Sequence, residues 1–409
     1  MLTRLLLLLI PLVASGTHRV VYPVKGGEPI GLAVRLAGAG DTIYVNAGIY
    51  KEHDIRIKKP LILIGIGQPV IDAERRSGIF EVNASGTLIR GFRLINTAIG
   101  SLEDYAAIRV NAADGIILED NEVSNAFFGF HFSRARRGLV RGNTIIGNPA
   151  TEHQTGNGIH LWKCDSFRIA GNRIEGHRDG IYFEFVTHSS VVENISRSNI
   201  RYGLHFMFSH EDLYRSNMFS GNGAGVAVMY SRNVTMEGNR FTRNQGPSAY
   251  GLLLKDITDS RVERNWFLQN TTGIYMEGSS RIDFRSNVFQ GNGWALRLQA
   301  SCDDNRFSGS NFSANTFDVS TNGSLVLNVF EANYWDKYQG YDLNKDLIGD
   351  VPFRPVSLFS MVVERMPFAV LLWRSFFIFM LDQAEKVLPV LTPENLMDSQ
   401  PKMKPYDIG

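Results

Sequence analysis

A short stretch in the middle of the chain places an imidazole and a thioether on one face of a predicted strand. Residues 204–207 read LHFM, and side chains alternate between the two faces of a strand. His205 and Met207 therefore share a face, and Met229 follows Met207 after 22 residues. Imidazole nitrogen and thioether sulfur together suit the soft ion Cu(I). The stretch indicates either a loosely held copper ion on an exposed face or a hydrophobic contact with an insertion or a partner.

An asparagine recurs through the centre of the chain at intervals of about 22 residues, and short apolar strands such as GIHL, GIYF and GLHF follow it. The recurring residues are Asn121, Asn143, Asn172, Asn194, Asn217, Asn239, Asn265, Asn287 and Asn305. This period, with three short strands per repeat, predicts an all-β fold, the right-handed, single-stranded parallel β-helix, in which stacked coils share a core. Each asparagine is expected at a corner, with its amide bonded along the stack.

Stacking in register makes residues one repeat apart into neighbours, about 4.8 Å apart along the axis. His131 and His160 become adjacent in this way, although a polar insertion at 148–158 separates them in the sequence. His188 and His210 are expected one coil apart near the next corner. The copper candidates on this reasoning are His131, His160, His205, Met207, Met229 and His210.

Carboxylate pairs bear on the alternative of polysaccharide chemistry, because long solenoid faces suit long polymers. Hydrolysis needs two carboxylates about 5 Å apart for retention or about 6.5–9.5 Å apart for inversion. Glu237 and Glu263 are the best case, since they are neighbours in one column. Arg215 and Arg285 flank them, which favours a surface charge ladder that keeps both carboxylates ionised. The charge pattern therefore argues against a catalytic dyad at Glu237 and Glu263.

The N-terminal segment indicates an exported protein. The 409 residues include 42 basic and 41 acidic side chains, and a formal charge of +1 provides no field for nucleic acid. Residues 1–16, MLTRLLLLLIPLVASG, have the layout of a signal peptide and are too short to span a bilayer, so the mature chain is expected in the periplasm. Cys164 and Cys302 lie about six repeats apart, too far to bridge, and are expected to be buried free thiols.

Three segments follow the predicted signal peptide. Residues 17–335 form the β-helix, with an amphipathic capping helix at 28–40 over its first coil and regular repeats from about residue 41. Residues 336–355 form a C-terminal cap with an Asp-rich loop, in which oxygens alternate as in calcium-binding loops. These oxygens belong to Asp342, Asn344, Asp346 and Asp350. The loop is predicted either to bind Ca²⁺ or to cap the last coil with Asx turns. The sequence does not decide between the two, because Leu347 stands where calcium loops place glycine.

Residues 356–409 change composition and are predicted to form an apolar helical tail. The run from Met366 to Leu381 is broken by Pro367 and Arg374 and is short for a transmembrane span. Such a tail either packs along the solenoid, lies in a membrane interface or docks on a membrane partner. The last two are favoured, because a soluble β-helix gains nothing from an apolar segment that it does not bury.

The phrase NYWDKYQGYDLNKDLIGDVPFRPVSLF at 333–359 and the closing LDQAEKVLPVLTPE at 381–394 resemble the NosD family of periplasmic maturation factors for nitrous-oxide reductase. The opening repeats, such as GDTIYVNAGIYKE, are shared more widely among pectate-lyase-like solenoids. The resemblance implies a non-catalytic copper-handling protein that works with an ABC transporter, the permease NosY with the ATPase NosF. It further implies copper supply by the chaperone NosL, delivery to the reductase NosZ, and membrane association through the transporter complex.

The preferred interpretation is a copper-maturation scaffold. A carbohydrate-binding or polysaccharide-processing β-helix is the alternative, followed by a purely structural periplasmic solenoid. The tail distinguishes the first two, because a secreted polysaccharide enzyme has no use for a helix that docks on a permease.

Overall fold

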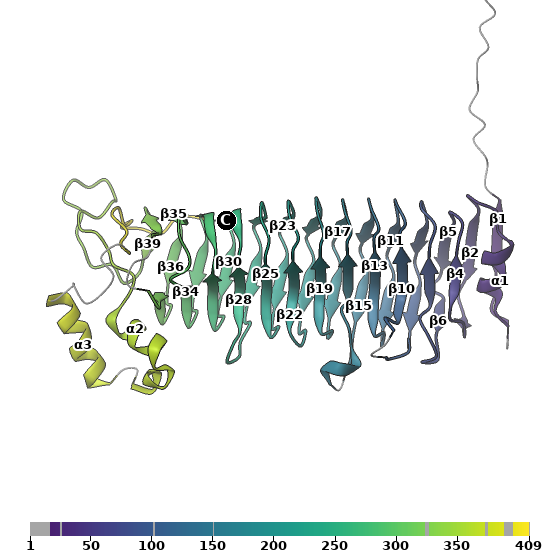
Figure 1. The fold of residues 1–409 in the computed structure, drawn as a ribbon, viewed down its shortest axis with the longest axis horizontal. Coiled ribbons are helices and arrows are strands. Elements are labelled where there is room, and N and C mark those ends of the chain that lie inside the picture. Colours follow the sequence, from purple (N-terminus) through teal and green to yellow (C-terminus); the bar gives the residue numbers. More distant parts are fainter. Residues whose placement is uncertain are drawn as a thin grey trace, which may run out of the picture.

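The computed structural model describes residues 17–24, 27–100, 103–149, 151–323, 327–372, 375–387 and 396–408. The predicted signal peptide at 1–16 lies outside these residues. The chain forms a long shaft of stacked coils with the tail helices at one end (Figure 1). Three parallel sheets run along the shaft, and successive coils contribute one strand to each. The predicted parallel β-helix is confirmed.

Within the described residues the three sheets have 14, 12 and 13 strands. The first sheet contains β1 (His18–Val21), β2 (Thr42–Asn46), β5 (Ile62–Ile66), β8 (Leu88–Arg90), β11 (Ile117–Glu119), β14 (Leu139–Arg141), β17 (Arg168–Ala170), β20 (Ser190–Val192), β23 (Leu213–Arg215), β26 (Thr235–Glu237), β29 (Thr258–Glu263), β32 (Ser280–Arg285), β35 (Arg306–Ser308) and β38 (Val329–Glu331). The second sheet contains β4 (Ile55–Ile57), β7 (Phe80–Val82), β10 (Ala106–Asn111), β13 (Phe128–Ser133), β16 (Ile159–Trp162), β19 (Asp179–Glu184), β22 (Tyr202–Met207), β25 (Ala224–Met229), β28 (Tyr250–Lys255), β31 (Thr272–Glu277), β34 (Trp294–Leu298) and β37 (Phe317–Thr321). The third sheet contains β3 (Ile49–Tyr50), β6 (Val70–Asp72), β9 (Arg93–Ile95), β12 (Glu122–Ser124), β15 (Thr144–Ile146), β18 (Arg173–Glu175), β21 (Ile195–Arg197), β24 (Met218–Ser220), β27 (Arg240–Thr242), β30 (Trp266–Leu268), β33 (Val288–Gln290), β36 (Asn311–Ser313) and β39 (Tyr334–Trp335).

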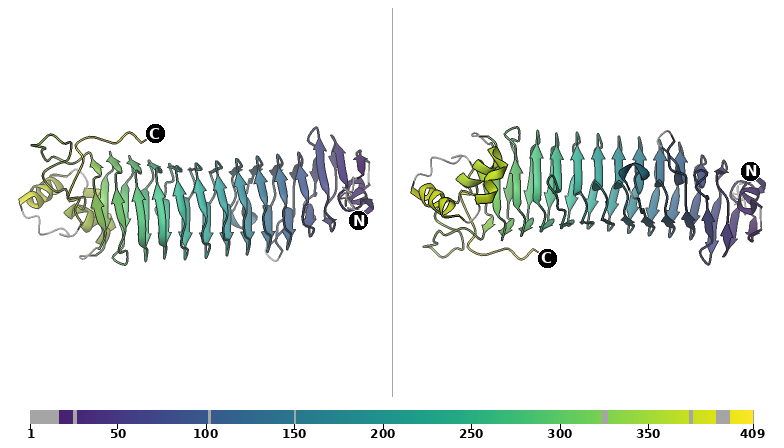
Figure 2. Two further views of the ribbon diagram at one scale, coloured as in Figure 1. Left: turned by 90° about the horizontal axis from the view of Figure 1, so that it is seen from above. Right: turned by 90° about the horizontal axis from the view of Figure 1, so that it is seen from below.

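Short helices lie at both ends of the shaft and in one insertion. They are α1 (Pro29–Leu36), the 3-10 helix η1 (Glu152–Gln154), α2 (Leu358–Arg365), the 3-10 helix η2 (Pro367–Leu372) and α3 (Phe376–Val387). The predicted capping helix is thus present as α1, and the two further views of Figure 2 place it at the end of the shaft opposite the tail. The insertion that contains η1 projects from the same side of the shaft as α2 and α3 (Figure 1).

One continuous hydrophobic core runs through the shaft, because each coil repeats the same inward apolar positions. Phe241, Phe267 and Phe289 illustrate the register, with ring centroids 4.7 and 4.9 Å apart on successive coils. The shaft begins earlier than the expected residue 41, because His18–Val21 pairs in parallel with Thr42–Val45. Parallel pairing of that first strand extends the first sheet by one strand beyond the regular repeats.

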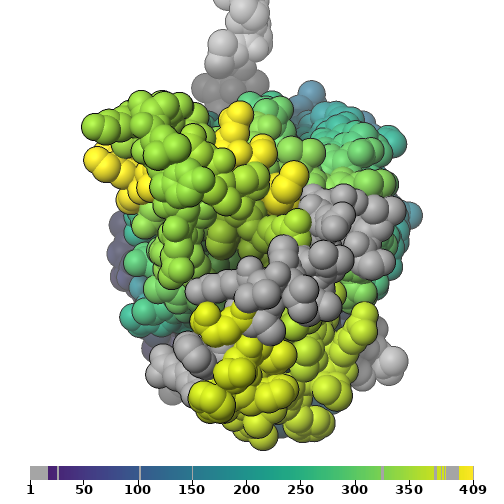
Figure 3. All heavy atoms as spheres, turned by 90° about the vertical axis from the view of Figure 1, so that its left-hand side faces the viewer, coloured from purple at the N-terminus to yellow at the C-terminus, as the bar shows by residue number. Residues whose placement is uncertain are grey.

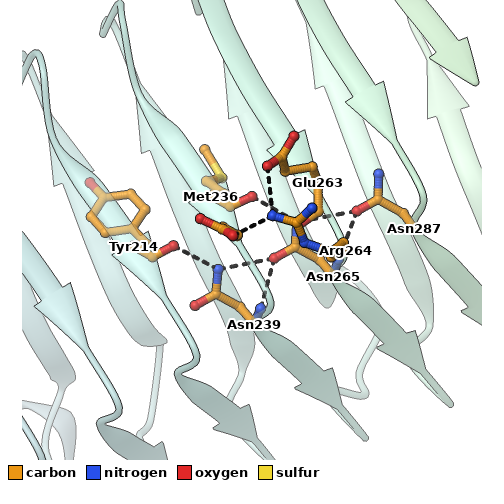
Figure 4. A network of polar contacts seen from close by, with 8 residues as sticks. Tyr214, Met236, Asn239, Glu263, Arg264, Asn265 and Asn287 are labelled. Atoms are coloured by element: carbon orange, nitrogen blue, oxygen red, sulfur yellow. Dashed lines mark hydrogen bonds and ion pairs between the residues drawn. The ribbon is translucent and has the colours of Figure 1, made fainter. Parts of the chain in front are cut away.

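Asparagines at the predicted corner bind one another along the axis. Asn239 Nδ2 donates to Asn265 Oδ1 at 3.0 Å, and Asn265 Nδ2 donates to Asn287 Oδ1 at 3.2 Å (Figure 4). Each Oδ1 also accepts the backbone N–H of the asparagine one coil earlier. A second ladder at another corner, which was not predicted, consists of Asn199, Asn222, Asn244, Asn270, Asn292 and Asn315. The predicted ladder is therefore confirmed, and the fold contains a second one.

The assignment of Asn305 to the first ladder is wrong. Ser310 follows Asn287 there, because the Ser310 hydroxyl accepts the Asn287 backbone N–H at 3.1 Å. Asn305 lies at a different corner, where it accepts the Ile282 N–H at 3.0 Å. The phrase around Asn305 resembles the others, but a coil of 23 residues places Ser310 in register.

Polar caps close both ends of the shaft. At the start, the buried Glu52 carboxylate accepts the N–H groups of Ile30 and Gly31 at 3.0 and 2.7 Å, which holds α1 over the first coils. At the other end, the buried Asp398 Oδ2 accepts Asn333 Nδ2 and Trp335 Nε1, both at 3.0 Å. Residues 396–408 therefore pack on the last coils and do not extend as helix, and Figure 3 shows the C-terminal third covering this end.

Both cysteines are free and buried, as predicted. Burial raises the pKa of the Cys164 thiol to about 12 and also raises the pKa of Cys302. A thiol that stays protonated is a poor nucleophile and a poor metal ligand. The two cysteines therefore belong to the core.

Candidate functional site

The outer face of the second sheet brings three predicted histidines into one column. His131 pairs with His160, and their rings stack with centroids 4.6 Å apart, so the predicted adjacency is confirmed. Tyr182 follows on the next coil, 4.7 Å from the His160 ring. His205 follows Tyr182 at 4.9 Å. We call these four residues the imidazole cluster.

The imidazole cluster is largely buried, which corrects the expectation of an open strand face. His131 and His205 each expose only 7% of their surface. Phe128 packs its ring 5.3 Å from His131 and 5.5 Å from His160. Tyr202 packs 4.7 Å from His205. Aromatic side chains three residues upstream on the same strands, or on a neighbouring coil, cover the imidazoles, and strand alternation alone does not reveal this.

Two imidazoles of the cluster are neutral at pH 7. Burial lowers the pKa of His131 to about 4, against the opposing attraction of Asp104, whose Oδ2 lies 3.7 Å from Nε2. Burial likewise lowers the pKa of His160 well below its ordinary value, and the neighbouring His131 and Arg178 add to this. The neutral form is the one that ligates metals.

The thioethers form a separate group at the far end of the same strands. Met207 pairs with Met229 in register, as predicted, and both are half-buried. Tyr182 Oη donates to Met207 Sδ at 3.8 Å. The His205 ring lies instead near Asp179, the first residue of β19, with Nδ1 3.6 Å from Asp179 Oδ2. Met207 and Met229 lie in register on adjacent coils, and we call them the thioether pair.

An exposed aromatic stack, which was not predicted from the sequence, consists of residues that follow the thioether pair and Glu184 in the sequence. Phe185, Phe208 and Tyr230 stack with ring centroids 5.3 and 4.9 Å apart and are 44%, 37% and 39% exposed. All three occupy left-handed backbone positions, with φ of 55°, 48° and 54°. The available signal was an aromatic residue following the outer-face column on three successive coils.

His210 lies apart from both groups. Its Nδ1 accepts the Arg232 backbone N–H at 3.3 Å. His188 is on the adjacent coil, as expected, but it binds Asp165 at 2.9 Å and Glu211 at 2.7 Å. Within the described ranges, no three His, Cys, Asp or Glu side chains gather closely enough to hold a metal ion. The metal roles of all the candidate residues therefore stay predictions.

The carboxylate pair on the first sheet is bound by one cation. Glu237 pairs with Glu263 in register, as expected. Arg264 bridges them, at 3.0 Å from Glu263 (Figure 4) and in close contact with Glu237. Arg285 instead binds Asp283. The arrangement agrees with a charge ladder, although the cation differs from those predicted.

The Asp-rich loop folds its oxygens onto its own backbone. Asp342 accepts the N–H groups of Asp346 and Leu347 at 3.2 and 2.9 Å. Asp350 accepts the N–H of Leu343 at 2.7 Å. Asn344 Oδ1 accepts the N–H of Asp346 at 3.1 Å, and Asp346 Oδ1 accepts that of Ile348 at 2.8 Å. These two are Asx-turn bonds, the arrangement weighed against a calcium loop above. Calcium binding by Asp342, Asn344, Asp346 and Asp350 stays a prediction.

The tail helices attach to the last coils and carry exposed apolar side chains. Phe359 of α2 packs on Phe317 of β37, and Glu364 pairs with Arg297 at 2.8 Å. Among the described residues beyond α2, the exposed large apolar side chains are Met366, Phe368, Val370, Leu371, Leu372, Phe376, Phe377, Met380 and Met397. None of the helices in the described part of the chain is long and apolar enough to cross a membrane.

Fold and site together define a parallel β-helix that carries imidazole and thioether groups on one outer face and an apolar helical tail on its last coils. A similar fold occurs in the catalytic unit of a GH87 α-1,3-glucanase from Streptomyces thermodiastaticus, with a TM-score of 0.60 and 12% identity, covering 79% of this chain and 69% of that one. At this identity the likeness concerns the fold alone.

Sequence comparison is more specific. Residues 147–344 match the family described as periplasmic copper-binding protein (NosD). A protein of Pseudomonas aeruginosa named probable ABC transporter binding protein NosD is 30% identical over 397 residues, 92% of this chain and 91% of the relative. Its namesake in Stutzerimonas stutzeri is 29% identical over 378 residues, 88% and 86% of the two chains. This chain belongs to the NosD family, as the phrase at 333–359 predicted.

Proposed function

We propose that this protein is a periplasmic accessory protein of an ABC transporter and handles copper for the maturation of nitrous-oxide reductase. The family description as copper-binding supports the cargo, and the names of the two relatives support the transporter. NosY and NosF are the proposed transporter, NosL the copper donor and NosZ the recipient. No reaction is proposed for the protein itself.

The exposed apolar surface of η2 and α3 carries this proposal. Phe368 and Leu371 expose 86% and 82% of their surface, and Phe376 exposes 76%. Large contiguous apolar patches on proteins mark contacts with partners or membranes. The ion pair between Glu364 and Arg297 fixes α2 to the shaft, so this surface is presented at a defined place. We propose that it docks on the permease.

The tail shares one face of the shaft with the imidazole cluster and the thioether pair. Register links His205 through Ala227, Leu253 and Tyr275 to Arg297, the residue that anchors α2. Four coils separate the two ends of this column, about 19 Å. A transporter bound to the tail would therefore face the same side as the thioether pair.

Membrane recruitment tests the docking proposal. Phe368→Ser/Leu371→Ser/Phe376→Ser replaces exposed side chains and is expected to leave the fold intact. We expect this variant to lose co-purification with the permease–ATPase pair by about tenfold or more. The matched control is Leu36→Ser/Ile49→Ser, which removes apolar side chains of 61% and 66% exposure at the opposite end. Equal recovery of wild type, variant and control would refute docking through this surface.

Copper binding is tested separately, at the thioether pair. Thioether sulfur suits Cu(I), and the pair lies in register on adjacent coils. We expect Met207→Leu/Met229→Leu to weaken Cu(I) binding in a chelator competition by about tenfold or more. Met218→Leu, an exposed methionine on the third sheet, is the control. Unchanged affinity in the double variant would remove the pair from the copper site without affecting the docking result.

A further inference from the structure

Buried polar atoms without hydrogen-bond partners concentrate at one place on the shaft. Of the twelve such atoms in the described residues, seven belong to residues 131–205. They are His131 Nδ1, Asn157 Oδ1, His177 Nε2, Arg178 Nε, Asp179 Oδ2, His205 Nδ1 and His205 Nε2. Elsewhere the ladders satisfy almost every buried amide. A native protein that leaves so many polar atoms unpaired in one region usually holds a water or an ion there.

Asp179 and His205 form the centre of this region. Asp179 is fully buried, and its Oδ1 accepts the Tyr202 N–H at 3.3 Å while Oδ2 has no hydrogen bond. His205 is more than nine-tenths buried, and neither of its nitrogens has a hydrogen bond. Two cations lie near Asp179: Arg178 Nε is 3.9 Å from Asp179 Oδ2, and the Asp179 charge raises the pKa of Arg201 against the effect of burial. A carboxylate oxygen and an imidazole nitrogen thus face each other in a dry environment.

The separation of these two atoms suits a shared ion better than a direct bond. His205 Nδ1 and Asp179 Oδ2 are 3.6 Å apart, whereas N–H···O hydrogen bonds span about 2.7–3.2 Å. Bonds of about 2.0–2.2 Å to a tetrahedral ion place two ligand atoms about 3.3–3.5 Å apart. A shift of a few tenths of an ångström would therefore complete two metal–ligand bonds. Nitrogen and oxygen ligands select borderline divalent ions such as Cu²⁺ and Zn²⁺, in contrast to a thioether pair.

We propose that Asp179 and His205 form a second metal site, separate from the thioether pair, that binds a borderline divalent ion. Copper as the physiological ion rests on the proposed function, but the site itself follows from the geometry. The protein then holds oxidised and reduced copper at different places on one face, with Tyr182 between the His160 and His205 rings and bonded to Met207. Arg178 opposes the cation by its own charge.

Titration of the purified mature chain with Cu²⁺ tests the site, with electron paramagnetic resonance as the readout. We expect bound Cu²⁺ to show coupling to an imidazole nitrogen, and Zn²⁺ to displace it. His205→Gln should remove that coupling, and Asp179→Asn should weaken Cu²⁺ binding by about tenfold or more. Arg178→Gln should tighten binding, because it removes the opposing charge. Circular dichroism verifies that each variant is folded.

Comparison with Cu(I) separates this proposal from the proposed function. Met207→Leu/Met229→Leu should keep full Cu²⁺ binding, and His205→Gln should keep Cu(I) binding at the thioether pair. If Cu(I) binding is absent but the Cu²⁺ signal depends on His205, the site stands and the copper-delivery role fails. If Cu²⁺ and Zn²⁺ bind equally to wild type, His205→Gln and Asp179→Asn, the unpaired atoms hold water only and the site is refuted.

Discussion

The asparagine corners and the imidazole cluster are two buried polar regions of one shaft, and they are built in opposite ways. At the corners Asn265 donates to the Met236 and Glu263 carbonyls and to Asn287, and it accepts from Asn239. In the cluster both nitrogens of His205 lack hydrogen bonds. The same coil geometry supports both regions, so the difference lies in the side chains.

This difference indicates which buried polar residues stabilise the fold and which are available to bind a ligand. A polar residue that recurs on every coil has partners above and below, and its bonds are made within the fold. A polar residue that occurs on a few coils only has unlike neighbours and is left with unpaired atoms, which cost stability unless a ligand binds. The irregular column from His131 to His205 is therefore the place to look for binding, and the regular corners are not.

Breaking the ladder is expected to have the largest effect. Asn265→Leu removes an amide whose exposed surface is 0% and strands several buried donors and acceptors. Each stranded group costs about 1–3 kcal/mol, so we expect a loss on the order of 3 kcal/mol or more in the free energy of unfolding by urea. A loss below about 1 kcal/mol would mean that neighbouring coils re-form these hydrogen bonds. The corner asparagines would then contribute little to the stability of the shaft.

The fold and the first ladder were predictable from the sequence because a 22-residue period places the leading asparagine of each repeat by counting. The second ladder was not predicted. The assignment of Asn305 to the first ladder was wrong because the sequence around it resembles the other repeats, whereas the length of its coil places it at a different corner. The candidate site was harder to predict from the sequence. Register predicted that His131 meets His160 and that Met207 meets Met229. It did not predict that His205 is directed to Asp179, because side-chain direction and burial depend on Tyr202 and Phe128 in a neighbouring column.

Asp212 provides an intermediate case, a buried carboxylate outside both asparagine ladders. Its Oδ1 accepts the Ser189 N–H, Oδ2 has no hydrogen bond, and burial raises its pKa to about 8. The folded state therefore binds more protons than the unfolded chain between about pH 4 and pH 8, so its stability falls as the pH rises through this window. Asp212→Asn should remove this dependence and stabilise the protein by on the order of 2 kcal/mol at pH 8.

Urea unfolding of wild type and Asp212→Asn at pH 5 and pH 8 measures this effect. The gain should be small at pH 5 and large at pH 8, because only the ionised carboxylate is costly. A gain of equal size at both pH values would assign the effect to the new amide bond and not to the charge.

Replacing a histidine of the imidazole cluster should change the stability of the protein in the opposite direction to Asn265→Leu. His205→Leu replaces two unpaired buried nitrogens by an apolar side chain of similar size. We expect the metal-free protein to gain about 1 kcal/mol in stability, since burying an unpaired polar group costs about 1–3 kcal/mol. Melting temperatures of both variants, measured in chelator, check the contrast. Destabilisation by more than about 1 kcal/mol would show that His205 is a structural residue like the asparagines.

The smallest effect is expected at Glu263, on the outer surface of the first sheet. Arg264 contacts both Glu237 and Glu263, but it is about half-exposed, and such pairs contribute about 0–1 kcal/mol. Glu263→Gln should therefore change the free energy of unfolding by less than about 0.5 kcal/mol, and less still in 1 M salt. The backbone carbonyl of residue 263, which binds Asn265, is retained in this variant. A large loss would mean that surface charge, and not the buried amides beneath it, holds adjacent coils together.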